Sequence, residues 1–297
     1  MNETGSYLDR ETGRVVAEPI VAGSSFTWLY RSSIGRVLGR FLFRSRRLHG
    51  LVERLADLSW SRWLVPWFVR SARVNVAECE RPPGTWRTLN ELFTRRLAPG
   101  SRPIDPDPAA LVAPGDGKLT VTPRLDRAAT LCVKSCTVPL AELADDQELP
   151  ARFAGGSAAV LRLYLGDYHR LHFPADGVPS RPRPVPGHYY SVTPFPGNDA
   201  NYPLVNSRTV TRFATDRFGE LCLVDVGGFL VAGIHATFVP GERVVKGQEK
   251  SFFAFGGSTL VILAEPGRLH WDKDLVEASA AGLEVAVKMG TRVALGV

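Results

Sequence analysis

Two adjacent glycines and a serine interrupt a strongly apolar stretch at residues 251–263. The apolar runs 252–255 and 260–263 predict two buried strands, because aromatic and β-branched side chains suit a packed sheet. Gly256 and Gly257 between them indicate a bend or a close approach of the backbone. The hydroxyl of Ser258, placed after such a bend, could reach the carbonyl just before it. Taken alone, however, the segment favours a simple β-turn.

A serine hydroxyl becomes a nucleophile only when a base takes its proton and a third group holds that base. Two upstream motifs supply candidates. Pro-Gly-Asp-Gly at 114–117 contains Asp116, and a second motif beginning at Asp167 contains His169 and His172. Separately, such an aspartate most often makes a turn contact, and such a histidine is more often a structural residue than a catalyst.

In this order, the three motifs resemble the phosphatidylserine decarboxylase family. The likeness begins near Asn90 and runs to the C-terminus, so it covers roughly two-thirds of the chain. That family usually has alanine where Gly115 stands, and Gly-Gly-Ser-Thr at 256–259 is a variant of its Leu-Gly-Ser-Thr; neither change removes a functional group. A further family element is matched only loosely at 205–210. Substrate contacts by Asn206 and Arg208 therefore stay open.

The resemblance implies self-cleavage. Ser258 would attack the Gly257 carbonyl, with His172 as the base and Asp116 as the partner of His172; Asp167 is the alternative partner. The resulting ester would eliminate to dehydroalanine, which hydrolyses to a pyruvoyl group and ammonia. The products would be a β chain of residues 1–257 and an α chain of residues 258–297 that stay together as a heterodimer. Dimerisation of that heterodimer is left open.

The pyruvoyl group formed from Ser258 would be the covalent cofactor. It would condense with the amine of phosphatidylserine and take up the electrons released as carbon dioxide leaves, which gives phosphatidylethanolamine for phospholipid biosynthesis. His169 is the expected acid that returns a proton, since imidazole titrates near neutral pH. His169 and His172 would point to opposite faces of a regular strand, so a turn or bulge is expected between them. No metal is expected, because the four cysteines lack metal-site spacing.

The elements that would position these residues are mainly strands, which predicts an α+β fold with a mostly β catalytic core at 85–297. A short helix is expected at 88–97, with Thr88 as its N-cap and Glu91 in a capping box, and a helical turn at 138–144. The proline-rich segment 179–186 predicts a surface connector. The expected strands lie at residues 118–123, 131–138, 158–165, 189–192, 209–213, 221–226, 229–239, 252–255 and 259–263, with a last pair within 282–296 around a turn at 288–290.

Residues 24–84 form a basic, tryptophan-rich segment, for which we expect amphipathic helices that bind an anionic membrane surface. Between residues 24 and 73, ten arginines face only two acids, Glu53 and Asp57, and leucines at 48, 51, 55 and 58 repeat at helical spacing. Helices docked on the protein's own core are the competing interpretation. Residues 1–23 predict a flexible lead-in.

Composition agrees with a folded protein of 297 residues, 44% hydrophobic and 22% charged. The net charge of +6 suggests an acidic partner; anionic lipid fits better than nucleic acid, since no nucleic-acid module is recognisable. No stretch has the pattern of a signal peptide or the length of a membrane span. We therefore expect a peripheral protein on the cytoplasmic face of the cell membrane, with mostly buried cysteine thiols.

Three other functions remain open at this point. Decarboxylation of a soluble amino acid would use the same chemistry but would not need the basic, tryptophan-rich segment. A serine hydrolase could use Asp116, His172 and Ser258 on an external ester. A lipid-binding module without activity would keep the N-terminal surface alone.

Overall fold

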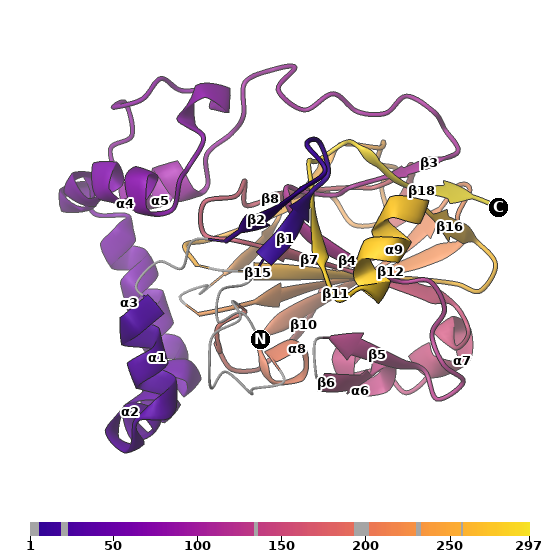
Figure 1. Cartoon of the computed structure of the whole chain (residues 1–297), viewed down its shortest axis with the longest axis horizontal. Coiled ribbons are helices and arrows are strands. Elements are labelled where there is room, and N and C mark those ends of the chain that lie inside the picture. The colour runs from indigo at the N-terminus through magenta and orange to yellow at the C-terminus, as the bar shows by residue number, and fades with distance from the viewer. Residues whose placement is uncertain (1–5, 19–22, 134–135, 193–201, 230–232, 257) are drawn as a thin grey trace.

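A ten-stranded sheet forms the centre of the computed structural model, which describes residues 6–18, 23–133, 136–192, 202–229, 233–256 and 258–297 (Figure 1). Every neighbouring pair is antiparallel except β1 and β17, which are parallel. In spatial order the strands are β10 (Arg183–Val185), β11 (Arg208–Thr215), β12 (Glu220–Gly227), β15 (Ser258–Ala264), β7 (Ser157–Leu163), β4 (Gly117–Thr122), β17 (Glu284–Val287), β1 (Ser6–Asp9) and β2 (Arg14–Ala17), with β9 (Gly177–Pro179) also paired to β11.

Strand β15 lies in the middle of this sheet, between β12 and β7. All seven of its residues are buried, and its side chains alternate between two cores. Leu260 and Ile262 enter one core, whereas Val261 and Leu263 enter the other. A strand buried on both faces is continuously apolar, which explains the run of hydrophobic residues after Ser258.

Smaller elements cover the two faces of the sheet. The Leu260 face packs against helix α9 (Lys273–Ala280) and two three-stranded sheets, β13 (Ile234–Ala236)–β14 (Glu249–Phe253)–β8 (Arg170–His172) and β16 (Leu269–Trp271)–β18 (Arg292–Gly296)–β3 (Ala110–Val112). The Val261 face packs against the hairpin of β5 (Thr130–Val133) and β6 (Cys136–Pro139), with α6 (Leu140–Ala144), α7 (Leu149–Phe153) and α8 (Tyr202–Val205).

The N-terminal helices stand as a column at one end of the sheet (Figure 1). Ser32 and Ser45 cap α2 (Ser33–Arg44) and α3 (Arg46–Ala56) by accepting hydrogen bonds from the backbone N–H groups of Gly35 and Leu48. Phe43 joins the column to the core, with its ring 4.9 Å from that of Tyr190. The elements are α1 (Gly23–Arg31), α2 (Ser33–Arg44), α3 (Arg46–Ala56), the 3-10 helix η1 (Ser59–Leu64), α4 (Val65–Ser71), η2 (Val76–Glu78) and α5 (Leu89–Phe93).

The expected mixed fold, with more strand than helix and helices before the core, is confirmed. Thr88 caps α5 as predicted, accepting from the Glu91 N–H at 3.0 Å. The Glu91 carboxylate, however, accepts from the N–H of Arg87, and the helix ends at Phe93, short of residue 97. The proline-rich stretch contributes the last residue of β9 and the short edge strand β10, where a missing N–H costs no ladder hydrogen bond.

Four local predictions were wrong. Residues 131–138 form a hairpin rather than one strand, and 189–192 contain no strand among their described residues. Of 229–239, the described part has only β13 as a strand. The expected last two strands are confirmed as β17 and β18, on either side of a turn, and they lie in two different sheets. Residues 6–17, placed in a flexible lead-in, pair with each other and with β17, because β17 would otherwise leave an open sheet edge.

Candidate active site

Ser258 begins β15 and is completely buried. It lies opposite Gly227 of β12 on one side and Leu163 of β7 on the other. Its hydroxyl has no hydrogen-bond partner within the described part of the chain. Burying an unpaired hydroxyl is unfavourable, so this side chain is not explained by a contribution to stability.

The backbone immediately before Ser258 is unusual. Gly256 has φ +139°, a value that residues with a Cβ rarely adopt. This agrees with the bend predicted from the two glycines. Gly257, whose carbonyl is the predicted target of Ser258, lies outside the described residues.

The strand opposite Ser258 is held in place by Asn206. The side-chain amide of this fully buried residue donates to the Gly227 carbonyl at 2.8 Å and to the Tyr190 carbonyl at 2.8 Å. Arg208 donates to backbone carbonyls, among them that of Leu143 at 2.6 Å. Both side chains, whose roles the sequence left open, are thus used to fix the backbone around the site.

His172 is held at both ring nitrogens. Its Nδ1 lies 2.9 Å from the Gly247 carbonyl and its Nε2 lies 3.2 Å from the Tyr168 hydroxyl. Since a carbonyl oxygen can only accept, Nδ1 carries the hydrogen and Nε2 presents its lone pair. Burial lowers the pKa of His172, which favours the neutral ring. The neutral ring therefore accepts a hydrogen bond from the Tyr168 hydroxyl at Nε2, and its protonation state is that of a base.

His169 is buried without any exposed surface. Its Nδ1 donates to the Asp167 carbonyl at 3.0 Å, and its Nε2 has no hydrogen-bond partner among the described residues. Burial, with a further effect of the nearby Arg95 charge, lowers the pKa of His169 to about 3. The expectation of titration near neutral pH is therefore wrong for this state, because desolvation disfavours the imidazolium.

His169 lies beside the segment that leads into the bend. Its carbonyl accepts from the Phe253 N–H at 3.1 Å, and its ring lies 4.0 Å from that of Phe93. Phe93 in turn contacts Phe255, with 5.1 Å between ring centroids. The turn or bulge expected between the two histidines is not found in β8, which begins directly after His169; the register shift lies in the facing strand β14, between Glu249 and Ser251.

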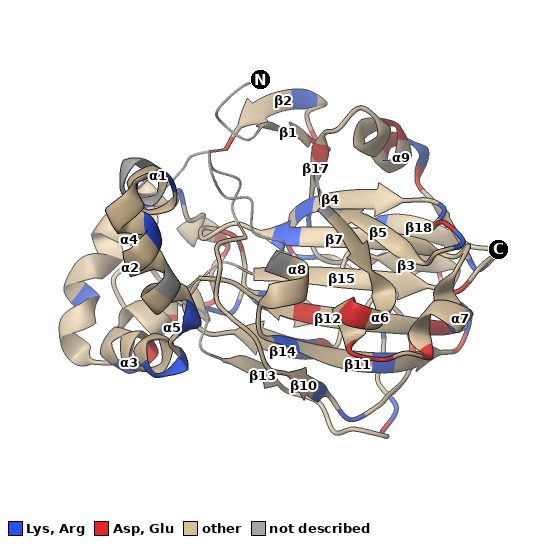
Figure 2. Ribbon diagram, turned by 90° about the horizontal axis from the view of Figure 1, so that it is seen from below, with Lys and Arg blue, Asp and Glu red and all other residues tan. Residues whose placement is uncertain are grey.

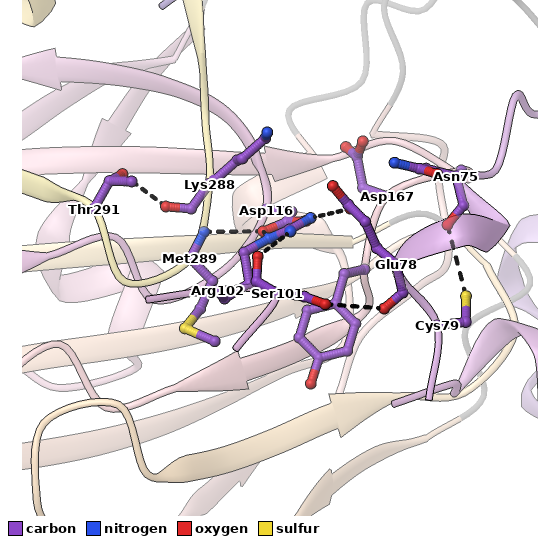
Figure 3. A network of polar contacts seen from close by, with 12 residues as sticks. Asn75, Glu78, Cys79, Ser101, Arg102, Asp116, Asp167, Lys288, Met289 and Thr291 are labelled. Carbon is purple, nitrogen blue, oxygen red and sulfur yellow. Dashed lines mark hydrogen bonds and ion pairs between the residues drawn. The ribbon is translucent and has the colours of Figure 1, made fainter. Parts of the chain in front are cut away.

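Asp116 does not hydrogen-bond to His172. Its carboxylate accepts from Arg102 at 2.9 Å (Nε) and 2.6 Å (Nη2), and from the Met289 N–H at 2.9 Å (Figure 3). Arg102 also binds Glu78 at 2.7 Å. A guanidinium presents its donors as a fork that matches one carboxylate, which explains why Arg102 occupies both oxygens. The expected Asp116 contact with His172 is absent from this arrangement.

Asp167, the alternative partner, is also engaged elsewhere. Its carboxylate accepts from the Lys118 ammonium at 2.8 Å and from the Tyr164 N–H at 2.7 Å. A charged cavity of about 290 Å³ is lined by these two aspartates together with Glu78, Arg102, Lys118 and Tyr168. Tyr168 lines this cavity and also contacts His172 through its hydroxyl.

Comparison with known proteins identifies the family of this chain. The model of the phosphatidylserine decarboxylase family matches residues 89–295. The chain belongs to the phosphatidylserine decarboxylase family. It is 37% identical over 285 residues to a phosphatidylserine decarboxylase proenzyme of Chlamydia muridarum, covering 96% of this chain and 95% of that protein. A proenzyme of the same name from Chlamydia pneumoniae is 37% identical over 289 residues, with the same coverage.

This member of the decarboxylase family has a buried ion pair that the sequence motifs did not indicate. Lys250 of β14 binds Asp225 of β12 at 2.5 Å, and each is 1% exposed. Asp225 lies opposite Leu260 in the sheet and Ser258 lies opposite Gly227, so both side chains are on the same face. The other carboxylate oxygen of Asp225 has no hydrogen-bond partner within the described residues.

No group of three or more metal-binding side chains is found in the described part of this family member. Cys79, Cys132 and Cys222 are free thiols; Cys79 and Cys222 are buried and Cys132 is exposed. No helix in the same part is both long enough and apolar enough to cross a bilayer.

Proposed function

We propose that this chain is a proenzyme that cuts itself between Gly257 and Ser258 and then converts phosphatidylserine to phosphatidylethanolamine. Membership of the family supports the reaction. The observation that carries the self-cleavage is the buried, unpaired hydroxyl of Ser258, directly after a glycine bend. Membership of the family also favours this reaction over that of a serine hydrolase.

In the proposed cleavage, the Ser258 oxygen adds to the Gly257 carbonyl carbon while its proton passes to the base, for which His172 is the candidate. The carbon–nitrogen bond then breaks, which leaves an ester and a free amine on residue 258. Loss of the Cα proton of residue 258 releases the residue 257 carboxylate and gives dehydroalanine. Water converts this group to pyruvoyl, with release of ammonia.

Position 258, the first of β15, suits a pyruvoyl group, because formation of this group removes the serine hydroxyl. That hydroxyl makes no hydrogen bond among the described residues, so its loss breaks none. When formed, the group supplies an electron sink for the bond that breaks as carbon dioxide leaves. The protein's own contribution lies in the surrounding residues. His169 presents an unprotonated Nε2 in a water-poor interior, where it can take up a proton and return it to carbon.

The two fragments would remain one molecule after the cut. Three strands of the proposed α chain pair with strands of the β chain. β15 lies between β12 and β7, and β17 lies between β4 and β1. β18 pairs with β3. Separation would break all these ladders and expose both cores, so we expect a stable heterodimer.

We also propose a lipid substrate and a peripheral location on the cytoplasmic membrane face; the N-terminal column supports contact with a membrane surface. Within residues 24–73, basic side chains recur along the helices (Figure 2). Twelve large hydrophobic side chains on the same elements are exposed, and Ile34, Phe41 and Trp63 each exceed 70%. Such a combination fits the interface of an anionic bilayer, and a soluble amino acid would not require it. The twelve are Trp28, Ile34, Val37, Leu38, Phe41, Leu51, Leu55, Leu58, Trp60, Trp63, Leu64 and Trp67.

Intact mass spectrometry tests the proposed cleavage. The purified wild-type chain should give two species, residues 1–257 and a pyruvoyl-blocked 258–297, and the Ser258→Ala variant should give one full-length species. Thr211→Val is the matched control. It removes another buried hydroxyl without a partner, on β11, and should leave cleavage unchanged. A wild-type protein that stays intact, with a free serine at 258, would rule out the proposal.

A further inference from the structure

Arg95, two residues after α5, is a buried arginine that forms no ion pair among the described residues. It is 6% exposed, and each of its hydrogen bonds in that part of the chain goes to a backbone carbonyl. Burial lowers the pKa of Arg95, but a guanidinium stays charged throughout the physiological range. A buried charge is costly and is normally matched by a carboxylate, so stability does not explain this position.

The guanidinium holds the backbone turn that carries His169. Its Nη2 donates to the Gly166 carbonyl at 2.8 Å and to the Asp167 carbonyl at 2.9 Å. The Asp167 carbonyl also accepts from His169 Nδ1 at 3.0 Å, since its two lone pairs can serve two donors. Arg95 and the imidazole therefore share one oxygen, and Arg95 fixes where that oxygen lies. Phe93, in the same segment, packs on the imidazole with 4.0 Å between ring centroids.

The charge of Arg95 also acts on His169. Burial is the main cause of the lowered pKa of His169, and the charge of Arg95 is the next, ahead of that of Lys118. Lys118 is neutralised by its ion pair with the Asp167 carboxylate at 2.8 Å, whereas Arg95 has no such partner in the described part of the chain. Cys79, another titratable neighbour of Arg95, stays neutral because burial raises its pKa.

We propose that Arg95 is the positioning residue for His169, fixing the turn that carries the imidazole and keeping its Nε2 free of a proton. That nitrogen has no hydrogen-bond partner among the described residues, so it is available to take up a proton and return it to carbon. The inference rests on the proposed role of His169 in decarboxylation. Proton transfer needs close and well-aligned atoms, and a misplacement of about 1 Å can slow a reaction by about 100-fold.

Two substitutions separate the charge of Arg95 from its hydrogen bonds. Arg95→Gln keeps an amide donor but removes the charge, whereas Arg95→Lys keeps the charge but loses the planar fork of donors. In the uncleavable full-length Ser258→Ala chain, histidine-selective 15N NMR follows the titration of His169 from pH 8 to pH 4.5. In Arg95→Gln, His169 should titrate at a higher pH than in the parent chain, because a cation that opposes the imidazolium is gone. In Arg95→Lys, it should titrate close to the parent.

Kinetics on a short-chain phosphatidylserine give the second measurement. With Ser258 intact, both variants should still cut themselves, since His172 is the candidate base for that step. In Arg95→Gln, kcat should fall by about tenfold or more with little change in KM, because the guanidinium binds the protein backbone rather than the substrate. Arg95→Lys should recover part of kcat. If the glutamine variant does not fold, a wild-type kcat in Arg95→Lys overturns the inference by itself.

Arg96→Gln is the matched control, because it removes the same charge from the neighbouring, exposed position. It should change neither the titration of His169 nor kcat. An unchanged His169 titration in Arg95→Gln would overturn the inference. A raised KM at wild-type kcat would also overturn it, since Arg95 would then bind substrate. If His169→Gln releases carbon dioxide at the wild-type rate, the proposed role of His169 fails, whereas the NMR comparison still decides whether Arg95 acts on the ring.

Discussion

Burial determines the protonation states of the candidate site at the scale of single residues. His169 and His172 are both neutral, and each donates from Nδ1 to a backbone carbonyl. They differ at Nε2, which receives the Tyr168 hydroxyl in His172 and has no partner within the described residues in His169. Two histidines three positions apart are therefore prepared differently. One accepts a hydrogen bond from a hydroxyl, and the other keeps an open lone pair in a buried setting.

The buried state of His169 predicts a loss of stability in acid. Its pKa is about 3 when folded and should be about 6.5 when unfolded, so between these values the unfolded chain binds more protons. Stability from this residue is complete above pH 6.5 and falls as the pH is lowered, by about 2 kcal/mol at pH 5. Urea unfolding of Ser258→Ala at pH 7.5 and 5.0 measures it. Adding His169→Gln should reduce the difference by about that amount, and an equal difference in both proteins would contradict this burial effect.

At the scale of elements, the site is a junction between two layers. Ser258 belongs to the central sheet, whereas His172 belongs to the small sheet of β13, β14 and β8 that covers it. Only the chain at 254–257 joins β14 directly to β15, and the proposed cut removes that link. The Lys250–Asp225 pair then ties β14 to β12, the neighbour of β15.

The energetics of this pair can be separated with single and double variants. Lys250→Met leaves a buried carboxylate without its cation, so we expect it to lower the free energy of unfolding by about 3–5 kcal/mol. Combining it with Asp225→Leu should recover most of the loss, because apolar side chains can replace a buried ion pair. Urea unfolding in the Ser258→Ala background compares the three proteins. A double variant no more stable than Lys250→Met would show that the two charges do not act as a pair.

At the scale of the whole molecule, most exposed hydrophobic side chains lie on the helical column and few on the catalytic core. Seventeen large hydrophobic side chains are exposed in the described residues, and the column carries twelve of them. Most of the column's basic residues lie on the same helices (Figure 2). The candidate site lies in the core, so the column would bring the core to the lipid surface rather than contribute to the chemistry.

Membrane binding should depend on both features of the column. Each arginine near an anionic surface contributes about 1 kcal/mol, which salt screens, whereas tryptophan and leucine burial is not screened. Binding to vesicles of mixed anionic and neutral lipid should therefore weaken with salt and not vanish. Replacing Trp60, Trp63 and Trp67 by serine should abolish binding and activity on bilayer substrate, while self-cleavage and activity on short-chain substrate persist.

The control for that experiment replaces Val178, Val239 and Val245 by serine. These three are exposed hydrophobic residues that lie outside the column. This variant should bind vesicles like the wild type. Equal loss of activity on bilayer and short-chain substrates in the tryptophan variant would show that these side chains support the core, and would remove the membrane interpretation.

The sequence by itself determined the features that depend on local chemistry. Glycines before Ser258 predicted the bend because φ near +139° is a property of glycine alone. Helical spacing predicted the amphipathic column because periodicity is a property of a single element. The partners of Asp116, Tyr168 and Asp225 were decided by the tertiary structure, since each lies in a different element from its partner or faces several candidates. Which strands pair across 100 or more residues, as β1 does with β17, depends on how whole layers fill the core, and no spacing within either segment encodes it.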